Sequence, residues 1–402
     1  MRIQETRDTY YRLLAQPRLP HRRYLFDTFD ATRRLAGLLG PRGVGKTTLM
    51  LQWIREKGNP ERCMYASLDH IYFSAHRLLD FVRDMHQLEG RTLFFLDEAH
   101  KYPEWNREIK NIYDSFPEVR IVFSGSSSLD LVKGQYDLSR CGMIYRLNGL
   151  SFREFILFQT GKTLTSFSLD DLLERRVEIS KELSNIPRIL GLFQEFLRVG
   201  YYPFYFEDPR TYYSRILNTI DKTIFEDIAN FFSLSTTKLP VFKRLLAYLA
   251  SIPPGEISVN ALARILEIDH KTVSGYLHMM QDTSLTHSLS LAKGGKAGLR
   301  SADKVLLENA NLYFAVAKET GLEPNLGSLR ETFFVNALRG SGVTVNYSKE
   351  GDYRASGRVF EIGGEGKTKK QIRGLKSTFL VKDGVMTAGA GEVPLHLFGF
   401  LW

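Results

Sequence analysis

The beginning of the chain alternates apolar runs of strand length with polar segments that contain glycine. Three such runs are Leu35–Leu39, Thr92–Leu96 and Val119–Phe123. Uninterrupted apolar runs of this length are typical of strands that are buried on both faces of a parallel sheet. The stretch Thr48–Lys57 is amphipathic instead and is followed by Gly58, so it predicts a helix that ends there. The pattern therefore predicts an α/β domain in this part of the chain.

The segment after Leu239 reads as short helices separated by tight breaks. Ser258 is positioned to cap a helix that runs to Leu266, and Asp269 to cap a second helix that runs to about Met280. In the second helix, apolar residues recur at i, i+4 and i+7 spacing and leave a polar face outward. Helix, short turn and polar-faced helix is the helix-turn-helix plan. The apolar face holds Val273, Leu277 and Met280, and the outward face holds His270, Lys271, Ser274, His278 and Gln281.

Two further runs, Leu285–Ala292 and Leu299–Leu307, predict strands on either side of Lys293-Gly-Gly-Lys296. A hairpin with a basic tip behind a helix-turn-helix is a wing suited to contacts with phosphate groups. Two interpretations are open. The module reads DNA, since its wing and its outward helix face are polar and basic, or it serves only as a packing or oligomerisation module.

Composition narrows the class of protein. The 402 residues exceed what one hydrophobic core usually covers, and a hydrophobic fraction of 43% is ample for folded domains. The formal net charge of +9 favours a polyanionic partner, of which nucleic acid is the commonest, and a basic soluble protein is the alternative. The two cysteines, Cys63 and Cys141, argue against a disulfide scaffold and a thiolate zinc site. No apolar run approaches ~20 residues and the N-terminus lacks a secretion signal, so we expect a cytoplasmic protein without a membrane partner.

The most informative motif follows the first predicted strand. Residues 40–47 read Gly-Pro-Arg-Gly-Val-Gly-Lys-Thr and precede the predicted helix, which is the context of a phosphate-binding P-loop. The glycines let backbone N–H groups close around phosphate oxygens, and the helix N-terminus adds positive potential. Lys46 is expected to reach the β- and γ-phosphates of ATP, and the Thr47 hydroxyl to ligate Mg²⁺. The residues predicted to bind ATP here are Gly40, Arg42, Gly43, Val44, Gly45, Lys46, Thr47 and Thr48.

The ends of the next two predicted strands carry the groups that ATP hydrolysis needs. Asp97 and Glu98 follow the second strand; Asp97 would hold the Mg²⁺ shell, and Glu98 would orient and deprotonate the attacking water. The third strand runs into Ser124-Gly-Ser-Ser-Ser128, at the edge where ligands bind in an open α/β sheet. Ser126 is our candidate for sensing the γ-phosphate or positioning water, and an ordinary serine-rich turn is the alternative.

These motifs, with others downstream, resemble those of a large bacterial and archaeal group of AAA+ ATPases. The resemblance covers nearly the whole chain and implies four parts: an ATPase core over residues 1–150, a helical lid over 151–235, a winged helix over 236–312, and a small α/β restriction-endonuclease-like domain over 313–402. The shared motifs are Gly40 to Thr47, Leu96-Asp-Glu-Ala99, Ser124-Gly-Ser-Ser-Ser128, Leu150-Ser-Phe-Arg-Glu-Phe155, Glu308-Asn-Ala-Asn-Leu-Tyr313, Gly327-Ser-Leu-Arg-Glu-Thr-Phe333 and Glu361-Ile-Gly-Gly364.

The resemblance also implies two residues of the nucleotide site outside the P-loop. Arg140 lies where the family carries an arginine after the sensor loop; such an arginine reaches the γ-phosphate of a neighbouring subunit, or else braces the lid. Pro203 ends Gly200-Tyr-Tyr-Pro203, which is similar to a lid turn of the family that approaches the base and ribose. Tyr201 replaces the family's second glycine, which argues against close backbone approach at that point.

The last segment carries three carboxylates that could share one or two Mg²⁺ ions: Glu331 on a predicted helix, Asp352 after a turn, and Glu361 at the end of a strand. The arrangement resembles the PD-(D/E)xK nuclease core. Gly363 stands where that core carries a lysine, which favours a degenerate nuclease-like domain that binds DNA over one that cuts it. The substitutes considered for that lysine are Lys367, Lys369 and Lys370, and the partners considered for a network without metal are Arg330, Arg354 and Lys369.

We therefore expect a Mg²⁺-dependent ATP-hydrolysing AAA+ protein that binds DNA, single-stranded or branched, and remodels it or translocates on it. The trans-acting role of the arginine described above implies a homo-oligomer, a hexameric ring in this family. The alternative is a nucleotide-gated switch that binds a protein partner, for example of the toxin type, without DNA motor activity.

Overall fold

The computed structural model describes residues 3–17, 20–125, 142–255, 257–292 and 304–402. The chain divides into two compact units, Met1–Asn148 and Gly149–Trp402. Each unit contains a five-stranded sheet, and the second also contains a two-stranded hairpin. No helix in these described ranges is long and apolar enough to cross a membrane.

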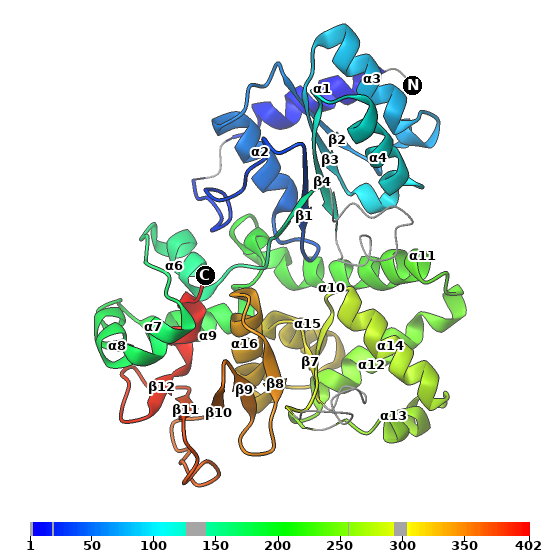
Figure 1. Cartoon of the computed structure of the whole chain (residues 1–402). Coiled ribbons are helices and arrows are strands. Elements are labelled where there is room, and N and C mark those ends of the chain that lie inside the picture. The colour runs from blue at the N-terminus through cyan, green and yellow to red at the C-terminus, as the bar shows by residue number, and fades with distance from the viewer. Residues whose placement is uncertain (1–2, 18–19, 126–141, 256, 293–303) are drawn as a thin grey trace. The chain divides into compact units, whose positions relative to one another are not determined.

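The first unit is a parallel sheet with helices on both faces. Its strand order is β2-β3-β4-β1-β5, and every neighbouring pair is parallel. Right-handed crossovers in this order place the helix after β1 on one face and the helices after β2 and β3 on the other, and Figure 1 shows α2 apart from α3 and α4 in this way. The elements are α1 (Ile3–Ala15), β1 (Leu35–Leu39), α2 (Lys46–Glu56), β2 (Cys63–Ser67), η1 (Ile71–Ser74), α3 (Leu78–Glu89), β3 (Leu93–Asp97), η2 (Ala99–Lys101), α4 (Trp105–Ser115), β4 (Arg120–Gly125) and β5 (Met143–Arg146).

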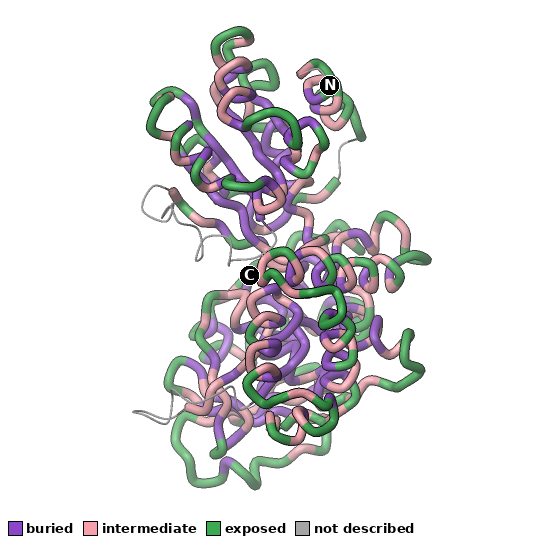
Figure 2. Tube along the Cα trace, turned by 90° about the vertical axis from the view of Figure 1, so that its right-hand side faces the viewer, coloured by how far each residue is buried: buried purple, intermediate pink, exposed green. Residues whose placement is uncertain are grey.

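The strands of the first unit are apolar because both faces of the sheet are covered. All residues of β1 and β3 are buried, and Figure 2 shows the buried core running along these strands. The three strands predicted from apolar runs are confirmed to within two residues at each end. Asp97, the last residue of β3, is only 2% exposed although it is charged. A buried carboxylate at the carboxyl end of a parallel strand marks the edge where ligands bind.

The second unit is mostly helical up to its hairpin and then mixed. Its sheet has the order β12-β11-β10-β9-β8, with parallel pairs among β10 to β12 and antiparallel pairs among β8 to β10. The helices are α6 (Phe152–Thr160), α7 (Leu169–Glu174), α8 (Arg176–Ser184), α9 (Ile189–Val199), α10 (Tyr212–Lys222), α11 (Ala229–Phe231), α12 (Pro240–Ser251), α13 (Val259–Leu266), α14 (His270–Asp282), α15 (Ala310–Thr320) and α16 (Leu326–Gly340). The remaining elements are η4 (Pro203–Phe206), η5 (Pro209–Thr211), η6 (Thr223–Ile228), η7 (Thr236–Lys238), β6 (Thr286–Leu289), β7 (Lys304–Leu307), β8 (Val345–Tyr347), β9 (Tyr353–Ala355), β10 (Arg358–Gly363), β11 (Thr378–Lys382), β12 (Glu392–Pro394) and η9 (Leu395–Phe400).

The helices predicted for the helix-turn-helix segment are present with their caps. The Ser258 hydroxyl accepts a hydrogen bond from the Ala261 N–H at the start of α13, and Asp269 accepts two backbone N–H groups at the start of α14. The predicted inward residues of α14 are buried, whereas Lys271 and His278 are exposed. β6 and β7 pair antiparallel, and β6 is shorter than predicted. The predicted tip, Lys293 to Lys296, and the first part of the second predicted strand lie outside the described residues.

Candidate nucleotide site

The backbone between β1 and α2 takes the form of a phosphate-binding loop. Gly43 and Gly45 have φ of 80° and 97°, in the left-handed region that glycine enters without strain. Gly45 is also the N-cap of α2, so the loop ends at the positive end of the helix. A Cβ atom on Gly40 would overlap the carbonyl oxygen of Leu147. Three of the predicted glycines are therefore required by the backbone itself.

Lys46 is the first residue of α2 and is 6% exposed. Its Nζ atom donates to the carbonyl oxygens of Gly40 and Pro41 at 2.8 and 2.9 Å. The ammonium group is thus held across the mouth of the loop by oxygen acceptors. Phosphate oxygens are stronger acceptors of a charged donor than carbonyl oxygens, so this position suits the predicted contact with phosphate.

Asp97, the last residue of β3, is the centre of a hydrogen-bonded group with side chains from α2, β2 and β4. The Thr47 hydroxyl donates to its Oδ2 atom at 2.5 Å, and the Tyr65 hydroxyl donates to the same atom at 2.8 Å. The Ser124 hydroxyl donates to the other oxygen, Oδ1. Burial, and next the charge of Asp97, raise the pKa of Tyr65, so its hydroxyl keeps its proton and remains a donor. The carboxylate is therefore fixed in orientation beside Thr47.

Glu98 has the left-handed conformation, with φ of 50°, which is uncommon for a residue with a side chain. Its N–H donates to the Ser124 hydroxyl at 3.0 Å, which anchors the backbone there. Its carboxylate makes an ion pair with Arg42 at 3.7 Å and lies 3.6 Å from the Nε2 atom of His100. The carboxylate thus faces the P-loop, as a base for a water beside the γ-phosphate must.

The predicted residues are thus only partly brought together by the described structure. Thr47, Asp97 and Glu98 meet as the sequence predicts, and Arg42 joins them through Glu98. Ser126 and Arg140 lie outside the described residues. Pro203 begins η4 in the second unit, and its predicted role toward the nucleotide stays a prediction.

Two residues of this site were not predicted from the sequence. Ser124 belongs to the serine run that drew attention to Ser126, but it is the first serine that contacts Asp97. Tyr65 is the middle residue of β2 and carries no local sign of function. Its position next to β3 in the sheet brings its hydroxyl to Asp97. Register between neighbouring strands, rather than a motif, would have identified it.

These residues fit ATP and Mg²⁺. The loop glycines and Lys46 would hold the phosphates, and Thr47 with Asp97 would hold the metal ion, which supplies positive charge to the phosphate oxygens when bound. The observation that favours this fit is the buried carboxylate aimed at the Thr47 hydroxyl at the end of the P-loop.

The comparison with protein families agrees with this geometry. Residues 32–156 match the family model described as an AAA domain, AAA_14. The match thus assigns an AAA-type domain to the first unit. Residues 190–323 match a second model, a domain of unknown function, DUF8612. No curated protein sequence matches the chain at a significant level.

Two solved structures are similar to parts of the chain. One is a katanin structure reported for its self-assembly, with 18% identity and a TM-score of 0.23, covering 42% of this chain and 61% of that one. The other is PCH-2 of C. elegans, with 16% identity and a TM-score of 0.23, covering 44% and 48%. This chain thus spans less than two thirds of either protein, and at these scores the likeness adds nothing to the argument. The AAA-type assignment rests on the family model and the site, while the winged helix and the nuclease-like domain stay predictions.

Two of the C-terminal carboxylates predicted to bind a second magnesium ion are paired with lysines, and their role toward a metal ion stays a prediction. Among the described residues, no group of three or more His, Cys, Asp or Glu side chains is arranged to hold a metal ion. Glu331 accepts hydrogen bonds from Lys304 and Tyr353 instead, and Glu361 pairs with Lys367 at 2.5 Å. Two lysines therefore supply the charge that a metal ion would supply. Asp352 accepts the N–H of Ile362 at 2.7 Å, and its charge adds to the burial that raises the pKa of Glu331 and Glu361.

Two of the cations predicted to neutralise these carboxylates without a metal ion pair with other residues in the structure. Arg330 pairs with Asp383, and Arg354 with Glu350. Lys367 is the one predicted substitute that reaches the cluster. A Cβ atom on Gly363 would lie 2.5 Å from the Lys367 stem, so this side chain fills the space where the missing lysine would stand. Burial raises the pKa of both Glu331 and Glu361, and the neighbouring lysines oppose that rise.

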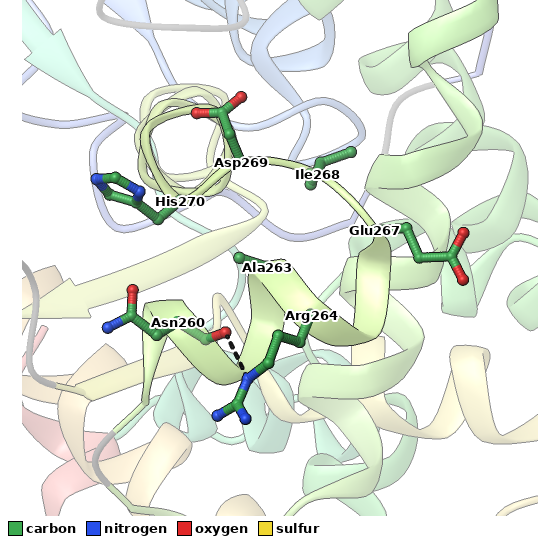
Figure 3. Close-up of a pocket in the computed structure, with 7 residues that line it drawn as sticks. All are labelled: Asn260, Ala263, Arg264, Glu267, Ile268, Asp269 and His270. Atoms are coloured by element: carbon green, nitrogen blue, oxygen red, sulfur yellow. Dashed lines mark hydrogen bonds between the residues drawn. The ribbon is translucent and has the colours of Figure 1, made fainter.

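The turn between α13 and α14 borders an open cleft of about 450 Å³ (Figure 3). Both helices contribute polar side chains to it, and Arg264 Nε donates to the Asn260 carbonyl oxygen at 3.4 Å. The cleft is mixed in charge, because Glu267 and Asp269 lie beside Arg264 and His270. Its lining residues are Asn260, Ala263, Arg264, Glu267, Ile268, Asp269 and His270.

Proposed function

We propose that this protein hydrolyses ATP in its AAA-type domain and uses the turnover to act on DNA. The observation that carries the ATPase part is the juxtaposition of Thr47, Asp97 and Glu98 at one edge of the sheet. Asp97 is buried and accepts four hydrogen bonds, three from side-chain hydroxyls and one from a backbone N–H, so it stays in place as the anchor of the metal shell. The Glu98 side chain is 20% exposed beside the P-loop, where a carboxylate can take a proton from water.

Charge and surface chemistry support DNA as the partner. The chain has a net charge of +9, and such an excess attracts polyanions at long range. The face of α14 that is not buried carries Lys271 and His278, both exposed. In a helix-turn-helix the second helix is the one that lies against nucleic acid. We propose that α12 to α14 with β6 and β7 form a winged helix, and that the last sheet belongs to a degenerate nuclease-like domain that binds without cutting.

The oligomer is proposed on the sequence position of Arg140 and on the AAA-type domain. A trans-acting arginine makes the site complete only when subunits meet, so activity would depend on protein concentration. The alternative function is a nucleotide-gated switch for a protein partner. It is favoured by the mixed charge of the cleft in Figure 3, which is less positive than a dedicated DNA-binding surface.

The test is the ATPase rate with single-stranded, duplex and branched DNA at two salt concentrations. A DNA-directed ATPase is stimulated by DNA, and the stimulation weakens as salt rises. Lys46→Ala provides the background, because it removes the ammonium from the phosphate loop. Lys271→Glu should reduce the slope of log affinity against log salt by about one unit, and Lys376→Glu, an equal charge change at another exposed site, should not. ATP turnover without any response to DNA would favour the switch.

A further inference from the structure

Arg23 links the P-loop to the last residue of the first unit. Its side chain is buried, and its guanidinium group donates to the carbonyl oxygen of Val44 in the P-loop. The same group donates to the carbonyl oxygen of Asn148 at 2.7 Å. One rigid, planar group therefore contacts both the loop predicted to close around phosphate and the point where the chain leaves the ATPase domain.

Residues 146 and 147, just before Asn148, make further contacts with the P-loop and the residues around it. The Leu147 N–H donates to the carbonyl oxygen of Leu39, the last residue of β1, at 2.8 Å. The Gly40 Cα lies so close to the Leu147 carbonyl that a side chain there would overlap it. The Tyr24 hydroxyl donates to the Arg146 carbonyl oxygen at 2.8 Å. Residues 146–148 are thus in direct contact with the P-loop and with the end of β1.

Gly149 and Leu150, the first two residues of the second unit, both contact Tyr201. A Cβ atom on Gly149 would overlap the ring of Tyr201, and the Leu150 N–H donates to the Tyr201 carbonyl oxygen at 2.7 Å. Tyr201 is buried, and its hydroxyl donates to Glu308. Its N–H donates to Asn311 Oδ1 at 2.8 Å. Tyr201, which stands where the family has a glycine, is therefore the residue that the first two residues of the second unit contact.

We propose that Arg23 is a positioning residue that couples the nucleotide state of the P-loop to the second unit through residues 147–150, with Tyr201 as the receiving side chain. The proposal rests on the proposed ATPase function. Because the guanidinium spans two carbonyl oxygens, movement of Val44 when phosphate binds must move Asn148 or break one of the hydrogen bonds. Packed segments of this kind shift between discrete arrangements rather than deform gradually.

The experiment is hydrogen–deuterium exchange of the full chain with and without the non-hydrolysable analogue AMP-PNP and Mg²⁺. In the wild type, the analogue should slow exchange in P-loop peptides and also change exchange at the amides of Leu150 and Tyr201. In Arg23→Met, the P-loop protection should persist and the change at Leu150 and Tyr201 should disappear. Steady-state turnover of that variant should fall by about threefold to thirtyfold with a smaller effect on KM.

Three controls separate the possible failures. Arg23→Lys keeps the charge but cannot span both carbonyls, so it should behave as Arg23→Met does and tests the proposal if Met prevents folding. Tyr201→Phe keeps the ring over Gly149 and should retain the coupling. Absence of P-loop protection in the wild type would refute the proposed function. P-loop protection without a change at Leu150 and Tyr201, or a wild-type response in both Arg23 variants, would overturn the coupling alone.

Discussion

The hydroxyl of Thr47 donates to the carboxylate of Asp97 over 2.5 Å, across 50 positions of the sequence. The two residues come from the end of the P-loop and from the end of β3, which is not the neighbour of β1 in the sheet. Their contact therefore depends on the order of the strands and not on proximity along the chain. It places the predicted metal-binding hydroxyl and carboxylate side by side, and four predictions follow from it and from other buried charges.

Glu98→Gln should bind ATP with near wild-type affinity and hydrolyse it about 10²- to 10⁴-fold more slowly, because an amide cannot take a proton from water. The amide keeps the size of the side chain, and the backbone anchor to Ser124 is unchanged. Binding of a fluorescent ATP analogue and steady-state release of phosphate measure the two properties separately. Wild-type turnover in this variant would show that another group acts as the base.

Tyr65→Phe should lower the free energy of unfolding by about 1–3 kcal/mol, because Asp97 loses one donor in a buried site. Turnover should fall as well, since the carboxylate is less firmly oriented beside Thr47. Urea denaturation and the ATPase rate are the measurements. Ser124→Ala is the matched comparison, because it removes the donor to the other oxygen of the same carboxylate. If neither quantity changed in either variant, the hydrogen-bonded group around Asp97 would not be what orients it.

Lys304→Met should lower the free energy of unfolding by about 3–5 kcal/mol, because it leaves Glu331 buried without its cation. The double variant Lys304→Met with Glu331→Gln should recover most of that loss, since the pair is then neutral. Urea denaturation of the three proteins measures the coupling. A double variant as unstable as the single one would mean that Lys304 acts by packing over the rings of Tyr347 and Tyr353.

Glu308 should make the stability of the second unit fall as pH rises. Burial raises the pKa of Glu308 from 4.5 to about 7, while hydrogen bonds from Tyr201, Asn309 and Asn336 oppose the rise. Between these two values the folded state holds a proton that the unfolded state has released. The stabilisation is therefore complete below about pH 4.5 and is lost as pH rises through about 7, by an amount on the order of 3 kcal/mol.

Thermal or urea unfolding between pH 5 and 8 tests this prediction. Glu308→Gln stays neutral throughout and should lose this part of the pH dependence. Glu323→Gln, which changes an exposed carboxylate in the same unit, should leave the profile as it is in the wild type. Identical profiles for the wild type and Glu308→Gln would show that Glu308 is ionised in the folded protein at acidic pH.

The sequence by itself determined the α/β domain that matches an AAA domain. Apolar runs of strand length predicted β1, β3 and β4, and residues 40–47, Asp97 and Glu98 predicted the nucleotide site. These features are local: a buried strand needs a continuous apolar run, and a phosphate loop needs glycines at fixed spacing before a helix. The caps of α13 and α14 could also be predicted from the sequence, because a capping side chain accepts hydrogen bonds from N–H groups two or three residues away.

Only the tertiary structure decided which distant side chains complete each group. It selected Tyr65 and Ser124 as partners of Asp97, Lys304 and Lys367 as the cations of the C-terminal carboxylates, and Arg23 as the link between Val44 and Asn148. The lysine partners of Glu331 and Glu361 could not be predicted from the sequence for the same reason. A carboxylate that is buried needs some positive partner, but whether that partner is a metal ion or a lysine depends on which side chain the fold brings within reach.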